Sequence, residues 1–143
     1  MDSPGRHSCG GTGECPFCNP AGQDIVAKNA LCYAFWDHYP VSQGHLLVIP
    51  FRHTPDFFSL TTEEKAALVS LIDACRDVLE EKFSPAGYNI GFNVGEAAGQ
   101  TVMHCHCHVI PRYAGDVPNP RGGVRGVLPK KKGYCRIHGD RRD

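Results

Sequence analysis

Histidine and cysteine alternate in the segment HCHCH, residues 104–108, which places three imidazoles at every second position. A neutral imidazole is both a nucleophile and a metal ligand, so the segment can bind a metal ion, attack a substrate, or do both. If the segment is a strand, His104, His106 and His108 project from one face, and Cys105 and Cys107 point into the opposite layer as small hydrophobes. Three interpretations follow. The histidines face solvent or have their hydrogen bonds satisfied within the core, they form an all-histidine metal site, or they form a nucleophilic site.

A second group of potential ligands is the pair Cys15 and Cys18, which has the CxxC spacing of a zinc knuckle or a redox pair. A redox pair normally opens a helix after a strand, whereas this pair follows a Gly-rich polar segment. The redox role is therefore disfavoured. Cys32 and Cys75 lie in apolar runs and are expected in the core. With eight cysteines in the chain, we expect metal ligands or buried thiols rather than a disulfide scaffold.

The composition is that of one ordinary globular domain. The 143 residues are 41% hydrophobic and 21% charged, and a chain of this length buries about two-thirds of its unfolded surface. Fifteen basic and fifteen acidic residues cancel, so no bulk field attracts nucleic acid or an anionic membrane. No apolar run reaches the roughly 18 residues of a membrane span, and the N-terminus lacks the apolar segment of a secretory signal. We therefore expect a cytoplasmic protein that binds neither nucleic acid nor membranes.

Hydrophobic periodicity predicts the elements that position these side chains. Four runs have the length and pattern of strands: residues 30–36, 45–50, 88–94 and 101–111. Thr61 and Glu64 form a capping box, and the apolar residues that follow at intervals of three to four predict an amphipathic helix that ends near Ser84. Strand, strand, helix, strand, strand with short links predicts an α+β fold, an antiparallel sheet with one long helix packed on a face.

Four blocks of the sequence, in this order, resemble the histidine triad (HIT) superfamily: GHLLVIP, LTTEEKAAL, NVGEAAGQTVMH and HCHCHVIPRYAGD. The last block fits the signature His-φ-His-φ-His-φ-φ, in which φ is apolar. The resemblance runs from about Cys15 to Asp116 and is greatest to the dinucleoside-polyphosphate hydrolase (fragile-histidine-triad-like) and bacterial HIT-protein branches. It implies a HIT-like catalytic domain over residues 15–116 that usually pairs as a homodimer. Residues 1–14 are Gly-rich and polar, and we expect them to be a flexible segment.

The resemblance also implies the chemistry. In such enzymes the middle histidine, here His106, attacks the α-phosphorus of a nucleotide and forms a nucleotidyl-histidine that water then cleaves. His108 would donate to the phosphate oxygens, with His45 beside the site and Gln100 facing the bridging or leaving oxygen. The implied substrate is an adenosine polyphosphate, as for a diadenosine-polyphosphate hydrolase, and magnesium can accompany it.

Three further positions match polar contacts in the family. Asn93 and Thr101 fall where family members contact phosphate, and Asp37 falls where a carboxylate accepts from the ribose hydroxyls. A glutamine, asparagine or aspartate at such positions can equally be a structural hydrogen-bonding group.

Many bacterial HIT proteins carry a CxxC pair completed by two histidines, which here are His53 and His104. The resemblance therefore implies a closed Cys2His2 structural zinc site made of Cys15, Cys18, His53 and His104. The alternative is reduced cysteines with no metal. Cys9 and His7 are possible competing ligands.

Residues 117–143 form a basic, Gly- and Pro-rich tail that is either a flap over the polyphosphate or a solvated loop or dimer strap. Other functions also remain open from the sequence. A phosphoramidate hydrolase or a dinucleotide phosphorylase of the same superfamily would use the same attack. A metal-dependent hydrolase would use the three histidines as ligands, and a nucleotide-binding module would form no adduct.

Overall fold

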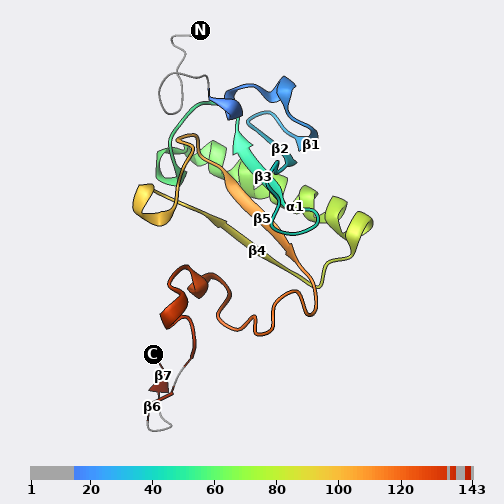
Figure 1. Cartoon of the computed structure of the whole chain (residues 1–143). Helices are drawn as coiled ribbons and strands as arrows, with labels where there is room; N and C mark the ends of the chain where they lie inside the picture. Colours follow the sequence, from blue (N-terminus) through green and yellow to red (C-terminus); the bar gives the residue numbers. More distant parts are fainter. Residues whose placement is uncertain (1–14, 135, 138–140, 143) are drawn as a thin grey trace.

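Five strands form one antiparallel sheet in the order β1-β2-β3-β5-β4, and a single long helix lies across one face of it (Figure 1). The computed structural model describes residues 15–134, 136–137 and 141–142 of the chain. The elements are β1 (Ile25–Lys28), β2 (Cys32–Trp36), β3 (Leu46–Pro50), α1 (Thr62–Phe83), β4 (Gly87–Phe92) and β5 (Cys107–Arg112). The predicted α+β class is confirmed. The segment 1–14, with Cys9 and His7, lies outside the described residues.

Strand β1 was missed from the sequence, which predicted four strands. Its four residues, IVAK, pair with β2 through an irregular register, and none of them is fully buried. Their apolar run of three residues is shorter than the roughly four to eight residues by which a strand is recognised.

Helix α1 begins and ends where the sequence predicts. The Thr61 hydroxyl accepts a hydrogen bond from the Glu64 backbone at 3.0 Å, and the Glu64 carboxylate accepts one from the Thr61 backbone at 2.8 Å. Ser84 closes the helix in a left-handed conformation with φ of 50°. Arg52 donates to both carboxylate oxygens of Glu64 at 2.8 Å, which ties the start of α1 to the loop after β3 that carries His53.

The main core lies between the sheet and α1. It consists mainly of Leu68, Leu71, Cys75 and Leu79 of the helix and Cys32, Ala34, Leu46, Val48, Cys105, Cys107 and Val109 from the sheet and its approach. The four cysteines predicted to be core residues are therefore all buried there. On the opposite face a smaller cluster of Tyr33, Phe35, Leu47 and Ile49 packs against Phe17.

The predicted strand at residues 101–111 is too long, because β5 begins only at Cys107. The backbone N–H of Cys105 donates to the carbonyl of Thr54 at 2.7 Å. His104 and His106 therefore precede the strand, yet the alternation continues through them. Cys105 and Cys107 pack in the core with α1, whereas His104 and His106 contact Phe17 on the opposite face and His106 and His108 line one pocket there.

Gly44 shapes the turn that delivers His45 to the start of β3. Its φ is 87°, and a Cβ at this position would lie 2.9 Å from the ring of Phe83 and 3.0 Å from Leu79. The turn thus needs glycine both for its backbone conformation and for the close approach to α1.

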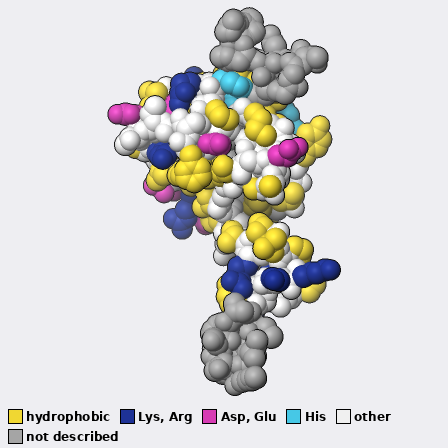
Figure 2. Space-filling model, turned by 90° about the vertical axis from the view of Figure 1, so that its left-hand side faces the viewer, with side chains coloured by type: hydrophobic (Ala, Val, Ile, Leu, Met, Phe, Trp, Pro, Cys, Tyr) yellow, Lys and Arg dark blue, Asp and Glu magenta, His cyan; other side chains and the backbone are white. Residues whose placement is uncertain are grey.

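Beyond Asp116 the chain leaves the sheet and projects from it, with short 3-10 turns at Gly123–Val127 and Pro129–Lys131 and a two-residue pairing of β6 (Arg136–Ile137) with β7 (Arg141–Arg142) (Figure 1). Basic and apolar side chains gather on this projection (Figure 2), where Val124, Val127 and Leu128 are exposed. Among the residues that the structure describes, no helix is long and apolar enough to span a membrane.

Candidate active site and metal centre

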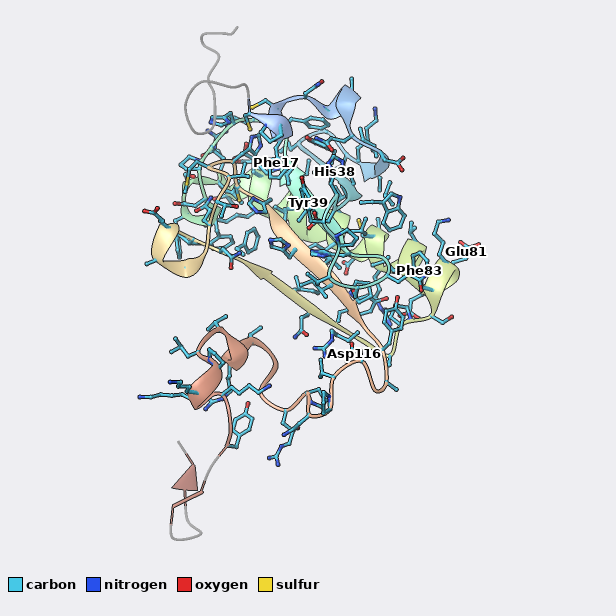
Figure 3. The ribbon with its side chains drawn as sticks, viewed as in Figure 1. Phe17, His38, Tyr39, Glu81, Phe83 and Asp116 are labelled. Atoms are coloured by element: carbon cyan, nitrogen blue, oxygen red, sulfur yellow. The ribbon has the colours of Figure 1, made fainter. Side chains whose placement is uncertain are left out.

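A pocket of about 540 Å³ opens on the sheet face that α1 does not cover. This volume lies within the range of small-molecule sites. Its apolar side is formed by Phe17, Phe35 and Leu47, and its polar side by Asp37, His38, Tyr39, Asn93, Thr101, His106 and His108. Figure 3 shows Phe17, His38 and Tyr39 gathered near this end of the sheet. The pocket combines an apolar wall with convergent polar groups, as ligand sites do.

His106 is held in one tautomer. Its Nδ1 lies 2.8 Å from the carbonyl oxygen of His104. A carbonyl only accepts, so Nδ1 carries the proton and, in the neutral ring, Nε2 holds the free electron pair. Burial lowers the pKa of His106, although the bond to the His104 carbonyl and the charge of Asp37 oppose this. The neutral, nucleophilic form is therefore favoured at neutral pH.

A second chain of bonds fixes the tautomers of His45 and His108. The backbone N–H of Val41 donates to Nδ1 of His45 at 3.1 Å, so the proton of neutral His45 sits on Nε2. That nitrogen lies 3.0 Å from Nδ1 of His108 and 3.2 Å from Oδ2 of Asp37. When Nε2 donates to His108, the proton of neutral His108 must lie on its own Nε2, where it is available as a donor.

Burial lowers the pKa of His45, opposed by the charge of Asp37. The pKa of His108 falls to about 4, chiefly through burial and then through the charges of His106 and His45. Both rings are therefore neutral at pH 7.

Of the four residues other than histidine predicted to contact substrate by hydrogen bonds, three line the pocket and one does not. Asn93 and Thr101 line the pocket, and so does Asp37, although its Oδ1 already accepts from the backbone of Tyr39. Gln100 does not line it. Its amide donates to the carbonyls of Pro55 and Val102 at 2.6 and 3.1 Å and accepts from Gly95 at 2.8 Å, so it braces the loop before the histidines. A contact between Gln100 and a leaving group stays a prediction, and it would require these bonds to break.

Four potential metal ligands meet beside this pocket: Cys15, Cys18, His53 and His104, whose ligand atoms lie within 4.8 Å of one another. The Nδ1 atoms of the two histidines are 3.2 Å apart, and the thiol-to-Nδ1 distances are 3.2–3.5 Å. These separations are close to the roughly 3.3–3.6 Å edges of a tetrahedron built with zinc–nitrogen and zinc–sulfur bond lengths.

The outer contact of His104 also suits a metal ligand. Its Nε2 donates to the carbonyl of Pro50 at 2.9 Å, which leaves the electron pair on Nδ1, the atom that faces the cysteines. A ligand histidine commonly directs its second N–H to a backbone carbonyl in this way. The donor set therefore fits a closed tetrahedral zinc site, and the predicted ligands are brought together by the fold.

A single metal ion on all three histidines of HCHCH does not fit this geometry. His104 faces the cysteines, His106 donates through Nδ1 to a carbonyl, and His108 turns Nδ1 to His45. The second cluster of potential ligands among the described residues is Asp37, His45 and His108. Its His45 accepts a backbone N–H at Nδ1, so its Nε2 is protonated rather than free to ligate.

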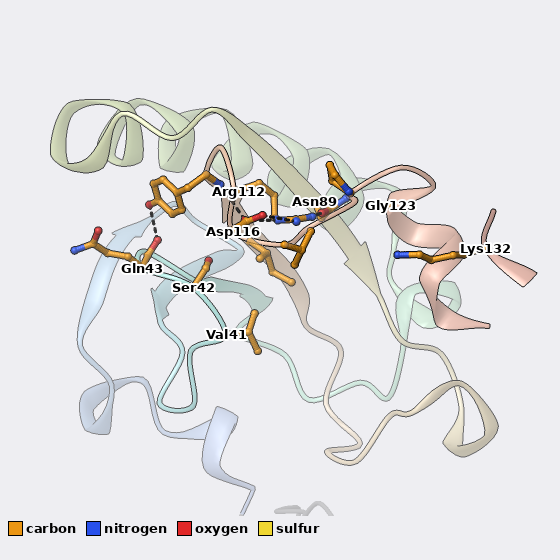
Figure 4. A pocket seen from close by; sticks show the side chains of 12 residues that line it. Val41, Ser42, Gln43, Asn89, Arg112, Asp116, Gly123 and Lys132 are labelled. Carbon is orange, nitrogen blue, oxygen red and sulfur yellow. Dashed lines mark hydrogen bonds and ion pairs between the residues drawn. The ribbon is translucent and has the colours of Figure 1, made fainter. Parts of the chain in front are cut away.

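Two more pockets continue along the same face. One, of about 600 Å³, shares Asn93 and His108 with the first, and another, of about 580 Å³, lies beyond it toward residues 117–132 (Figure 4). The most prominent cation of the last pocket, Arg112, is engaged by Asp116 at 2.8 Å and by Asn89 at 2.7 Å. None of the histidines that the structure describes lines this last pocket.

Phe17, His38 and Tyr39 line the first pocket but were not predicted. The signal for Phe17 was its place between Cys15 and Cys18, since a pair of ligands fixes the residues that they enclose. His38 and Tyr39 lie in a turn, where only the three-dimensional structure brings them to the pocket.

Comparison with known proteins places these features in context. The HIT domain family matches residues 20–115. The AP-4-A phosphorylase of Mycobacterium tuberculosis is 38% identical over 93 residues, 64% of this chain and 48% of that protein. The asymmetrical bis(5'-nucleosyl)-tetraphosphatase of Schizosaccharomyces pombe is 39% identical over 97 residues, 68% of this chain and 53% of that one. The matched region thus spans about half the length of these relatives.

Solved structures agree with the fold. A HIT family protein from Bacillus anthracis aligns with a TM-score of 0.67 and 36% identity over 74% of this chain and 76% of the other. A zinc-bound histidine triad family protein from Mycobacterium smegmatis aligns with a TM-score of 0.66 and 29% identity, over 81% and 94% of the two chains.

Proposed function

Because the chain belongs to the HIT domain family, we propose that it is a nucleotide hydrolase or nucleotidyl transferase acting at the α-phosphorus of an adenosine polyphosphate. The observation that carries this proposal is the bond from Nδ1 of His106 to the His104 carbonyl, which leaves Nε2 as a free electron pair in a pocket of nucleotide size. Residues 15–116 form the proposed catalytic unit, cytoplasmic and paired as a homodimer.

In the first step, Nε2 of His106 forms a bond to the α-phosphorus, and the bond from phosphorus to the leaving oxygen breaks with its electron pair on that oxygen. Nε2–H of His108 donates to the phosphoryl oxygens, where charge accumulates in the transition state. In the second step an acceptor oxygen attacks phosphorus, the P–N bond returns its electron pair to Nε2 of His106, and a water acceptor releases its proton to the solvent. With water the product is AMP, and with inorganic phosphate it is ADP.

The other pocket residues bind and orient in this proposal. Asn93 and Thr101 contact phosphate, and Asp37 accepts from the ribose hydroxyls while its second oxygen stays near His45. Phe17, Phe35 and Leu47 provide an apolar surface suited to the adenine ring. Magnesium would accompany the polyphosphate, and the basic residues 117–143 would cover it as a flap.

Zinc is proposed as a structural ion bound by Cys15, Cys18, His53 and His104. It would hold the N-terminal segment against the approach to β5 and would supply no chemistry at phosphorus. The zinc-bound relative and the tetrahedral donor spacing support this assignment.

The test is to incubate the full chain with a panel of adenosine substrates, quench rapidly, and search by mass spectrometry for an AMP adduct on His106. The panel contains diadenosine tetraphosphate and an adenosine phosphoramidate, each with and without inorganic phosphate. We expect an adduct on His106 that decays to AMP or ADP, and none in His106→Ala although that variant still binds nucleotide. Turnover by His106→Ala at the wild-type rate would exclude the mechanism. Tight nucleotide binding without any adduct would indicate a non-catalytic binding module.

A further inference from the structure

Phe17 joins the proposed metal site to the proposed nucleophile. It lies between the ligands Cys15 and Cys18, in a short 3-10 turn, Pro16–Cys18. Its ring centre is 5.1 Å from that of His106, in an edge-on arrangement, and 6.0 Å from that of His104. The same ring therefore contacts one residue of the metal cluster and the imidazole that would attack phosphorus.

Other contacts hold Phe17 in this place. The hydroxyl of Tyr33, a fully buried residue, donates to the Phe17 carbonyl at 2.6 Å, and the Phe17 ring packs on Phe35 at 5.6 Å. The turn itself is closed by a single backbone bond, from Cys18 to Cys15. The Gln23 amide also donates to the Pro16 carbonyl at 2.9 Å. A three-residue turn has little stability of its own, so the ligand cluster on either side of Phe17 adds a constraint at both ends of the turn.

The imidazole of His106 needs such a constraint. Its Nδ1 bond to the His104 carbonyl fixes the tautomer, whereas the tilt of the ring about that bond depends on the side chains packed against it. The described neighbours whose rings pack against it are Phe17 and His108, from different sides of the pocket. Without the Phe17 ring, one wall of this slot would be open to water.

We propose that Phe17 is a positioning residue for His106, through which the cluster of Cys15, Cys18, His53 and His104 orders the attacking imidazole. This inference rests on the proposed function and adds a role for the cluster beyond holding the fold. Loss of the metal ion or of the Phe17 ring would leave the His106 nucleophile in place but poorly aligned. Misalignment by about 1 Å is enough to slow a reaction roughly a hundredfold.

The experiment compares Phe17→Leu with wild type as zinc-loaded full-length proteins. Phe51→Leu is the matched control, because its ring stacks on Tyr33 at 5.0 Å in the same aromatic row and does not line the pocket. The measurements are zinc content, substrate affinity, the rate of His106 adduct formation at saturating diadenosine tetraphosphate, and the ring nitrogen resonances of His106 by NMR without nucleotide.

For Phe17→Leu we expect one zinc per chain, an adduct rate lower by about tenfold or more, and a broadened His106 signal. The affinity should stay within about threefold of wild type, because leucine keeps an apolar side chain on the surface proposed for the adenine ring. Phe51→Leu should retain the wild-type rate and a sharp signal. An unchanged adduct rate in Phe17→Leu, or a loss confined to affinity, would show that Phe17 is only a wall of the pocket. A wild-type protein that forms no adduct would instead refute the proposed function, whereas the NMR comparison would still test the positioning.

A second arm tests the link to the metal. Stripping zinc with a chelator should slow adduct formation in wild type about as much as Phe17→Leu does. In the Phe17→Leu protein, stripping zinc should cause a further loss of less than about threefold, because both changes break the same link. Losses that multiply would overturn the coupling. If circular dichroism shows that the zinc-free protein is unfolded, the comparison of zinc-loaded Phe17→Leu with wild type alone decides whether Phe17 positions His106.

Discussion

Nε2 of His45 lies 3.0 Å from Nδ1 of His108, across neighbouring strands of the sheet. Because Val41 donates to the other nitrogen of His45, the direction of this bond is set from the backbone outward, from Val41 through His45 to His108. The last donor in this series of hydrogen bonds is Nε2–H of His108, a residue that lines the pocket with His106. His45 therefore acts on the site through the tautomer of His108.

His45→Ala should lower the maximal rate by roughly tenfold to a hundredfold, with a smaller change in KM, because His108 then loses the donor that directs its proton toward the substrate. His45→Gln should recover part of the rate, since its amide N–H can replace Nε2–H. Steady-state kinetics of the two variants checks this. Equal losses in both variants would mean that an N–H donor at this position does not set the tautomer of His108.

Cys18→Ala should abolish stoichiometric zinc binding and lower the melting temperature by several degrees, because three donors remain of a closed four-donor site. The matched control is Cys75→Ala, which changes a fully buried cysteine of α1 that packs in the core. It should lose stability through a cavity but retain zinc. Elemental analysis and thermal melts of both variants separate the two causes, and full zinc content in Cys18→Ala would rule out the proposed ligand set.

The helix and the central strands could be predicted from the sequence because each follows a local rule. A capping box marks the start of α1, and continuous apolar runs mark β2 and β3. Strand β1 follows no such rule, since its pairing with β2 is a tertiary event. The same holds at β5. There Cys105 bonds to Thr54, and the strand begins only at Cys107, later in the chain than the alternation of residue types suggests.

For the candidate site, too, the sequence predicts some features and not others. The residues of the HCHCH segment and the CxxC pair could be found by type and spacing. Their separate orientations could not, because the irregular backbone before β5 turns His104 to the cysteines and His106 to the pocket. Gln100 illustrates the limit, since its position in the motif says nothing of the three hydrogen bonds that hold its amide inside the loop.

Glu64→Ala should lower the free energy of unfolding by about 2 kcal/mol or more, because it removes both the capping box of α1 and the paired bonds to Arg52. Glu63 stands one residue earlier in the same first turn and is exposed, so Glu63→Ala should cost only a few tenths of a kcal/mol, about the size of a helix-dipole effect. Urea unfolding of the two variants measures the difference. Similar midpoints for both would show that the Glu64 capping bond and the Arg52 bonds together contribute nothing net.

Protonation of His108 links stability to pH. In the folded protein the pKa of His108 is about 4, against an ordinary value of 6.5, because the ring is buried and because protonated His106 and His45 would repel its charge, while Asp37 acts in the opposite direction. Between these two values the unfolded chain binds the proton and the folded chain does not. The stabilising contribution is therefore complete above pH 6.5 and is lost progressively as the pH falls toward 4.

His108→Asn should accordingly lose less stability on acidification than wild type. Between pH 7 and 4.5 we expect the free energy of unfolding of wild type to fall by on the order of 2 kcal/mol more than that of the variant, since each pKa unit corresponds to about 1.4 kcal/mol. Urea unfolding of zinc-loaded proteins at a series of pH values provides the two curves. Acid effects on Glu64 and the cysteine cluster are shared by both proteins and cancel in the difference, whereas the repulsion of His108 by protonated His45 and His106 is part of the measured difference. Parallel curves would mean that His108 titrates near 6.5 in the folded state, and hence that its ring is open to water rather than held between His45 and His106.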